Sequence, residues 1–355
     1  MKRQPPLSRR TFIKLTATVA AGAALASCSP RQSPATPTDA ASAGIKPTLP
    51  PSPTSGSVPA GTSPSTPDQA NPTETSANPE PSATTSPAYL AVVHGPDPAA
   101  ITRAAIEALG GMAAFVSAGY DVIIKPNICT DYHPPEYATT TNPTVVGTLV
   151  TMCLEAGARR VRVMDYPFGG TATSAYATSG IGDAVEAAGG EMQVMIPSKY
   201  KFVDIPQGRD ITKVQIYPDI LETDLLINVP IAKDHGSTRL TLGGKNLMGV
   251  ILDRGMMHLN LDQRIADLTS LVRPPLTVID AVRILTANGP TGGDLSDVRQ
   301  LDTVIASRDV VAADAYATTL FGLTGSDIGY IQASADMGLG TMDLASINIQ
   351  EINLG

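Results

Sequence analysis

Residues 121–164 read DVIIKPNICTDYHPPEYATTTNPTVVGTLVTMCLEAGARRVRVM, and this stretch decides the fold class. The apolar run at 121–124 predicts a buried strand, and the run at 161–164 predicts another. Between them, residues 144–156 have the spacing of a helix, which Gly157 ends. A strand, a helix and a second strand in this order are typical of the α/β class.

The same alternation continues on both sides of this unit. It predicts strands at 89–94, 225–229, 276–279 and 303–306, and helices at 99–118, 175–188, 262–272 and 310–321. We therefore expect an α/β domain with a largely parallel sheet and flanking helices. The short strand-like runs at about 192–217 follow one another without a helix. They predict a small antiparallel insertion or a second lobe.

Two patterns near the start predict export and a lipid anchor. Residues 8–14, SRRTFIK, form a twin-arginine signature, and the apolar stretch after it is too short to span a membrane. Residues 25–28, LASC, resemble a bacterial lipobox, in which the cysteine, here Cys28, is lipidated. We expect residues 1–28 to be a signal peptide, and the mature protein to be a membrane-anchored lipoprotein of the periplasm or cell surface. The alternative is an ordinary secretory signal in which Cys28 is incidental.

Residues 29–87 consist mainly of Pro, Ser, Thr and Ala. Such a segment cannot bury enough apolar surface to offset the entropy lost on ordering, so it is expected to be a disordered linker rather than a folded proline-rich domain. Residues 88–355 have the length of one globular domain or of two closely associated lobes.

Charge and cysteine content exclude several classes of protein. The chain carries 25 Lys and Arg against 33 Asp and Glu, and it has no tryptophan, which argues against nucleic acid as a partner. Apart from Cys28, its cysteines are Cys129 and Cys153. Two thiols cannot hold an ordinary iron–sulfur cluster or a four-cysteine zinc site. They are expected to be two buried small apolar residues or to form one disulfide.

The polar stretch at 228–258, NVPIAKDHGSTRLTLGGKNLMGVILDRGMMH, indicates a site. Polar residues also follow the other predicted strands, and the carboxyl ends of parallel strands meet at one edge of a sheet. These residues are Lys125, Asn127, Asp165, Asp280 and Asp309. The alternative is that loops after strands are polar in any case, and for Asp309 we favour a role as a helix N-cap.

Two kinds of site are compatible with these residues. Imidazole and carboxylate groups suit zinc, iron or manganese, and the candidate ligands of such a divalent metal are His235, His258, Asp280 and Asp314. The alternative is that the histidines bond to the backbone and that Asp314 pairs with an arginine. Cationic and amide side chains suit a small anionic substrate. The candidates for this catalytic or binding role are Lys125, Asn127, Lys233, Lys245, Asn246 and Arg254.

Several short motifs share one resemblance. They are KPN at 125–127, NVP at 228–230 with Lys233 and His235, and KNLMG at 245–249 with Arg254 and His258. They resemble a prokaryotic family known as domain of unknown function 362. Many of its members carry a ferredoxin-like cysteine module. This chain lacks those cysteines, so we expect no iron–sulfur cluster of its own.

The leading hypothesis is an exported, lipid-anchored protein with a metal- or anion-dependent active site for a small anionic substrate. The first alternative is a lipoprotein that binds a solute without converting it. The second, which only the family resemblance suggests, is a redox-accessory protein that docks an iron–sulfur partner.

Overall fold

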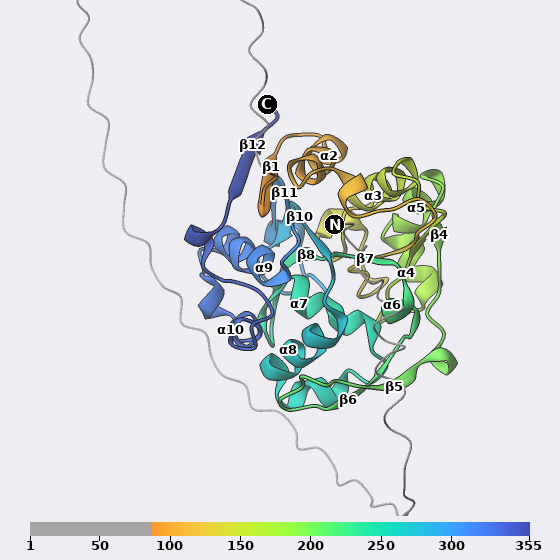
Figure 1. The fold of residues 1–355 in the computed structure, drawn as a ribbon, viewed down its shortest axis with the longest axis vertical. Helices are drawn as coiled ribbons and strands as arrows, with labels where there is room; N and C mark the ends of the chain where they lie inside the picture. The colour runs from red at the N-terminus through yellow and green to blue at the C-terminus, as the bar shows by residue number, and fades with distance from the viewer. Residues whose placement is uncertain (1–86) are drawn as a thin grey trace, which may run out of the picture. The chain divides into compact units, whose positions relative to one another are not determined.

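A ten-stranded mixed sheet forms the centre of the protein (Figure 1). The computed structural model describes residues 87–355. The main sheet has the order β12-β1-β11-β10-β7-β2-β3-β4, and β8 and β9 extend it beside β10. Its strands are β1 (Leu90–His94), β2 (Asp121–Pro126), β3 (Arg160–Val163), β4 (Glu191–Met192), β7 (Leu225–Val229), β8 (Ile231–His235), β9 (Arg239–Thr241), β10 (Leu276–Leu285), β11 (Val298–Ser307) and β12 (Ile349–Asn353).

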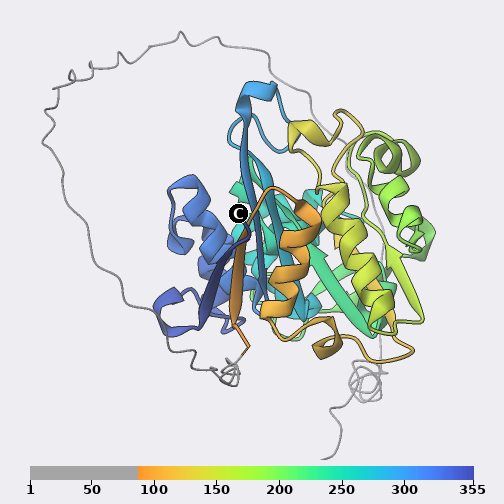
Figure 2. The ribbon, with the colours of Figure 1, turned by 90° about the horizontal axis from the view of Figure 1, so that it is seen from above.

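Helices cover both faces of this sheet (Figure 2). One face packs against α2, α3 and α5, and the other against α8, α9 and α10. The helices are α2 (Pro98–Ala108), α3 (Pro143–Glu155), α4 (Ala172–Thr178), α5 (Ile181–Ala187), α6 (Asp219–Glu222), α7 (Gly243–Asn246), α8 (Leu261–Val272), α9 (Val310–Thr318) and α10 (Gly329–Asp336).

Strand β2 shows how the sequence produces these two layers. Its side chains alternate between the faces, so that Val122 and Ile124 join the core under α2 and α3, whereas Ile123 joins the core under α8 and α9. Lys125 follows the same alternation and projects on the side of Ile123. Because β2 is buried on both faces, its middle residues, 122–124, are all apolar, as is usual in parallel strands.

The predicted fold class is confirmed: the central sheet is mostly parallel, with flanking helices. Strand β2 pairs in parallel with both β3 and β7, with Ile124 opposite Val163 and Ile227. The exceptions are β11, which runs antiparallel to β1 and β10, and the antiparallel pair β8–β9. The strands β10 and β11 have ten residues each, longer than the apolar runs at 276–279 and 303–306 predict, because they extend together as a hairpin.

The predicted antiparallel insertion is confirmed in part. Strands β5 (Lys201–Asp204) and β6 (Lys213–Ile216) pair antiparallel in a sheet of their own. The run that begins at Met192 differs, because β4 pairs in parallel with β3 and so belongs to the main sheet.

Glycines shorten two predicted helices. The helix expected at 99–118 ends at Ala108, since Gly110 and Gly111 have φ angles of 100° and 80°. The helix expected at 175–188 divides into α4 and α5 at Gly180, whose φ is 67°. Left-handed backbone of this kind cannot continue a right-handed helix.

Several sequence predictions concern segments outside the described residues. The predicted signal peptide, Cys28 and residues 29–86 of the predicted linker fall there. Within 87–355, none of the helices has the length and apolar character needed to cross a membrane. Cys129 and Cys153 are both free and buried, so the interpretation as small buried residues holds and a disulfide does not form.

Candidate anion-binding pocket

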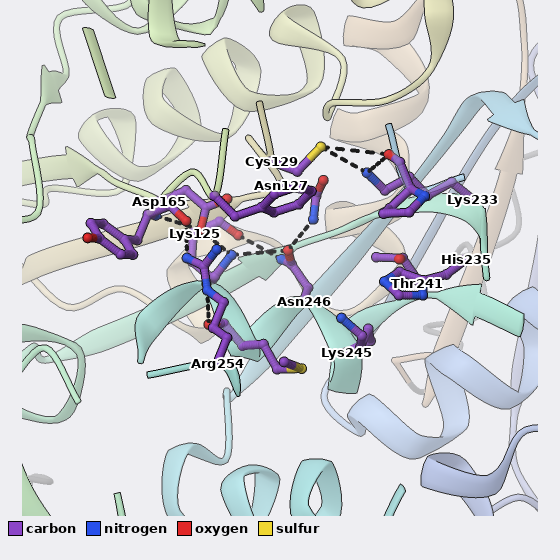
Figure 3. Close-up of a pocket in the computed structure, with 15 residues that line it drawn as sticks. Lys125, Asn127, Cys129, Asp165, Lys233, His235, Thr241, Lys245, Asn246 and Arg254 are labelled. Carbon is purple, nitrogen blue, oxygen red and sulfur yellow. Dashed lines mark hydrogen bonds and ion pairs between the residues drawn. The ribbon is translucent and has the colours of Figure 1, made fainter. Parts of the chain in front are cut away.

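A pocket that is open to solvent lies where β2, β3 and β8 end, and the space between its walls, with the solvent at its mouth included, is roughly 400 Å³ (Figure 3). All six residues predicted to hold an anion line it, as do Asp165 and His235. The lining residues are Lys125, Asn127, Cys129, Asp165, Tyr166, Phe168, Lys233, His235, Thr241, Lys245, Asn246, Met248, Gly249, Arg254 and Pro290. The ends of β2, β3 and β8 contribute Lys125, Asp165 and Lys233, as the order of elements predicts, and the segment after β8 supplies Lys245, Asn246 and Arg254.

Lys125 is fully buried and donates three hydrogen bonds. Its Nζ lies 2.7 Å from Oδ1 of Asp165, 2.9 Å from the carbonyl oxygen of Pro126 and 3.0 Å from Oδ1 of Asn246. Burial lowers the pKa of Lys125, and the carboxylate of Asp165 opposes that shift. The second oxygen of Asp165 accepts the backbone N–H of Ile128 at 2.6 Å. Both members of the Lys125–Asp165 ion pair are therefore fixed by further hydrogen bonds.

Gly249 permits the chain to pass close to this pair. A Cβ at this position would lie 2.0 Å from Oδ1 of Asp165 and 2.5 Å from Nζ of Lys125. A side chain at this position would displace the ion pair, and this steric restriction explains why the KNLMG motif ends in glycine.

A relay of three asparagine side chains crosses the floor of the pocket. Asn228 donates to the carbonyl oxygen of Gly243 at 3.0 Å and accepts from Nδ2 of Asn246 at 2.9 Å. Oδ1 of Asn246 then accepts from Nζ of Lys125 and from Nδ2 of Asn127, each at 3.0 Å. Because a carbonyl oxygen can only accept, the relay sets the orientation of every amide. It leaves Oδ1 of Asn127 buried without a partner among the described residues.

The short helix α7 carries Lys245 and Asn246, and Asp314 holds its first turn. Oδ1 and Oδ2 of Asp314 accept the backbone N–H groups of Gly243 at 2.6 Å and Gly244 at 2.8 Å. These donors have no partner within the helix, so a carboxylate at this end stabilises it. Burial raises the pKa of Asp314 to about 7, although the two N–H groups oppose the shift.

Lys233 is also fully buried, and its acceptors are neutral. Its Nζ donates to the carbonyl oxygens of Thr139 at 2.6 Å and Pro290 at 2.8 Å, and it lies 3.3 Å from Sγ of Cys129. All three of its N–H groups therefore have acceptors, but none of these acceptors is a carboxylate that would neutralise the positive charge.

Lys245 differs from both other lysines of the pocket. Within residues 87–355 its Nζ has no hydrogen-bond or ion-pair partner. Burial, together with the positive charges of Lys233 and Arg254, lowers the pKa of Lys245 to about 7. Arg254 donates from Nε to the carbonyl oxygen of Met248 at 3.0 Å and from a second nitrogen to that of Tyr166, and its pKa is lowered by burial.

His235 is neutral at pH 7. Its Nδ1 accepts the backbone N–H of Ser237 at 3.1 Å, so the proton of the neutral ring resides on Nε2. Burial, together with the nearby charges of Lys245 and Lys233, lowers the pKa of His235 to about 3. The ring can therefore donate a hydrogen bond but carries no charge.

The four predicted metal ligands are not brought together, which corrects that part of the sequence analysis. His235 lines the pocket, whereas His258 is exposed in the 3-10 turn Gly255–Leu259. Asp280 accepts the N–H groups of Asn142 at 2.7 Å and Val282 at 3.0 Å, and Asp314 serves α7. Each carboxylate is thus occupied by backbone donors. Among residues 87–355 no group of three or more His, Cys, Asp or Glu side chains could hold a metal ion.

Cys129, Tyr166 and Thr241 also line the pocket, although the pattern of polar residues did not predict a site role for them. Cys129 stands two residues after Asn127, and Tyr166 directly follows Asp165. Cys129 and Tyr166 are both predicted to line the site if one or two more residues after each strand end are included. Asp309, by contrast, caps α9 as expected, accepting from Val311 N at 2.8 Å and Ala312 N at 3.1 Å.

Comparison with known proteins identifies the family. The model of the domain of unknown function DUF362 matches residues 122–319, which include the whole lining of the pocket. The chain belongs to the DUF362 family. It is 26% identical over 252 residues to a thylakoid-associated protein of Synechocystis sp., an alignment that covers 67% of this chain and 74% of the relative.

Among solved structures, this DUF362 protein is similar to the lactate racemase apoprotein from Thermoanaerobacterium thermosaccharolyticum. The TM-score is 0.40 at 13% identity, and the match covers 62% of this chain. It spans 54% of the racemase, about half its length. The family therefore rests on the match at 122–319.

Proposed function

We propose that this protein binds a small carboxylate or phosphate anion in the pocket at the ends of β2, β3 and β8. One observation carries the proposal: four cationic side chains line the pocket, and Asp165 is the carboxylate among its described lining residues. Asp165 already pairs with Lys125. Lys233 and Arg254 therefore bring positive charge that no lining carboxylate neutralises, and Lys245, whose pKa is about 7, adds to it when its amine is protonated.

The surplus is local. Residues 89–355 contain 18 Lys and Arg against 29 Asp and Glu, so an acidic domain concentrates unneutralised cations at one buried place. Buried charge without a counterion is costly, and an anion in the pocket relieves that cost. Lys245 and the guanidinium of Arg254 supply donors for it, and His235 offers Nε2–H.

The charge pattern supports an organic or inorganic anion rather than a resident metal. A zinc, iron or manganese ion needs anionic or neutral donors around it, whereas this pocket presents cations. The donor set does not fit a metal, and no metal is part of the proposal.

The place of action is a further part of the proposal. The twin-arginine signature and the lipobox at Cys28 support a protein that acts outside the cytoplasm on a lipid anchor. Two alternative functions are compatible with an anchored protein. It could capture a solute without converting it, or it could dock an iron–sulfur partner. The anion site favours a small-molecule ligand.

Thermal unfolding of the full chain tests anion binding. Succinate, citrate, phosphate and sulfate are each titrated at constant ionic strength against wild type, Lys245→Met and Lys201→Met. Specific binding raises the melting temperature with ligand concentration in wild type and Lys201→Met, whose substituted lysine is exposed, but not in Lys245→Met. Phosphate and sulfate also stabilise proteins by exclusion from their surface, and that effect is equal in all three. Equal shifts in the three proteins for every anion would overturn the proposal.

A further inference from the structure

The three lysines of the pocket are not equivalent. Lys125 and Lys233 each have three acceptors, which is the capacity of an ammonium group. Lys245 lines the same pocket with none within residues 87–355. In Figure 3 its side chain stands apart from the hydrogen-bonded groups around Lys125 and Lys233. Its nitrogen is therefore available to a ligand.

The surroundings of Lys245 also favour the uncharged amine. The pKa of about 7 arises from burial first, and then from the positive charges of Lys233 and Arg254. An ordinary lysine has a pKa near 10.4, so at pH 8 the neutral fraction of Lys245 is about two hundred times that of an exposed lysine. A neutral amine with a free lone pair is a nucleophile toward carbonyl carbon.

The rest of the pocket complements a carbonyl compound that also carries a carboxylate. Arg254 lines the pocket as a permanent cation, and Lys233 adds positive charge that no lining carboxylate neutralises. Neutral His235 holds its proton on Nε2, where it can donate to an oxygen. The anion would be held by the cations while its carbonyl meets Nζ of Lys245.

We propose that Lys245 is a catalytic nucleophile that forms an imine with a 2-oxo acid bound in this pocket. The inference rests on the proposed anion binding and names the substrate class. Nζ attacks the carbonyl carbon, a C–N bond forms, and the carbonyl oxygen takes a proton from the amine to give a carbinolamine. Loss of the hydroxyl with the second amine proton releases one water and leaves the C=N bond, so atoms and charge balance.

Reductive trapping on the full chain tests this step. Pyruvate, oxaloacetate and 2-oxoglutarate are each incubated with the protein and sodium cyanoborohydride, which reduces an imine to a stable secondary amine. Trypsin then cannot cleave after Lys245, so the adduct appears on the intact peptide 240–254. Exposed Lys201 and Lys213 report background modification. We expect Lys245 to be labelled at least tenfold faster than either of them at pH 8, as its larger neutral fraction requires.

The variant Lys245→Arg keeps the charge but cannot form an imine, so it should lose the 240–254 adduct while anions still stabilise it. Absence of an adduct at Lys245 with all three acids, or labelling no faster than that of Lys201 and Lys213, would overturn the imine. Succinate separates the two proposals, because it carries carboxylates but no keto group that could form an imine. If succinate stabilises the protein and no 2-oxo acid is trapped, anion binding stands and the imine falls. If neither occurs, both fall.

Discussion

Nζ of Lys125 lies 2.7 Å from Oδ1 of Asp165, and neither side chain is more than 3% exposed. Lys125 lies near the end of β2 and Asp165 follows β3, the neighbouring parallel strand, so the ion pair joins the ends of two strands beside the pocket. Its burial distinguishes it from the surface pair Arg103–Glu155, whose side chains are 43% and 56% exposed.

Removal of one partner of the buried pair should be strongly destabilising. Asp165→Ala leaves the ammonium of Lys125 buried without its carboxylate, and we expect the free energy of unfolding to fall by about 3–5 kcal/mol. Urea unfolding followed by circular dichroism measures it. Glu155→Ala is the matched control and should change the unfolding free energy far less, because water replaces the exposed partner. Similar losses in the two variants would contradict a structural role for the buried pair.

Substitution of Gly249 should disturb the same pair sterically. In Gly249→Ala the new methyl group would lie 2.0 Å from Oδ1 of Asp165, so we expect a loss of about 1–3 kcal/mol or more in unfolding free energy. Gly236→Ala is the control, since the nearest atom to a Cβ there is 4.0 Å away. If Gly249→Ala is as stable as Gly236→Ala, the close approach is not restrictive.

Lys245→Met should stabilise the ligand-free protein while it abolishes anion binding. A lysine whose pKa falls from about 10 to about 7 on folding costs up to roughly 4 kcal/mol at neutral pH, and methionine removes that cost at similar length. Thermal melts with and without ligand measure both effects. A variant that is less stable than wild type in the absence of ligand would show that Lys245 is held by interactions of its own.

The carboxyl groups of Asp314 and Asp280 should make stability fall as pH rises. Their folded-state pKa values are raised by burial to about 7 and about 6, so between pH 4 and these values the folded protein binds more protons than the unfolded chain. This contribution to stability is full below pH 4 and is lost as pH rises through the folded pKa. Asp314→Asn should therefore flatten the fall up to about pH 7, and Asp280→Asn only up to about pH 6. Urea unfolding at half-unit pH steps checks the two windows, and unchanged slopes would contradict them.

Cys28 should determine membrane association. We expect Cys28→Ala to move the protein from the membrane fraction to the soluble extracytoplasmic fraction, and Arg9→Lys with Arg10→Lys to retain it in the cytoplasm. Fractionation with immunoblotting measures both, and Cys129→Ala serves as the cysteine control. Membrane retention of Cys28→Ala would show that another feature anchors the chain.

The fold class follows from local pattern alone. Apolar runs of strand length alternate with helical spacing, and the period of each is a property of neighbouring residues. The carboxyl ends of parallel strands then place Lys125, Asp165 and Lys233 at one edge without any knowledge of contacts. Glycines with left-handed backbone set the end of α2 and the break between α4 and α5. The spacing of apolar residues does not show which glycine adopts that conformation.

The roles of individual polar residues were decided by the tertiary structure. Asp314 is a candidate metal ligand in the sequence because carboxylates suit a divalent metal, but in the structure it accepts hydrogen bonds from backbone groups 70 and 71 residues away. Lys233 and Lys245 look alike in the sequence. Lys233 meets Thr139 and Pro290, which the fold brings from 94 and 57 residues away, whereas Lys245 meets neither.

The sequence alone therefore determined the α/β class, the edge of the sheet at which a site lies and the cationic residues that form it. Only the tertiary structure decided which of those cations is satisfied and which is free, because hydrogen bonding depends on distances between residues far apart in the chain. The polar stretch found in the sequence is therefore part of a pocket in which Lys245 is the lysine without a partner among the described residues.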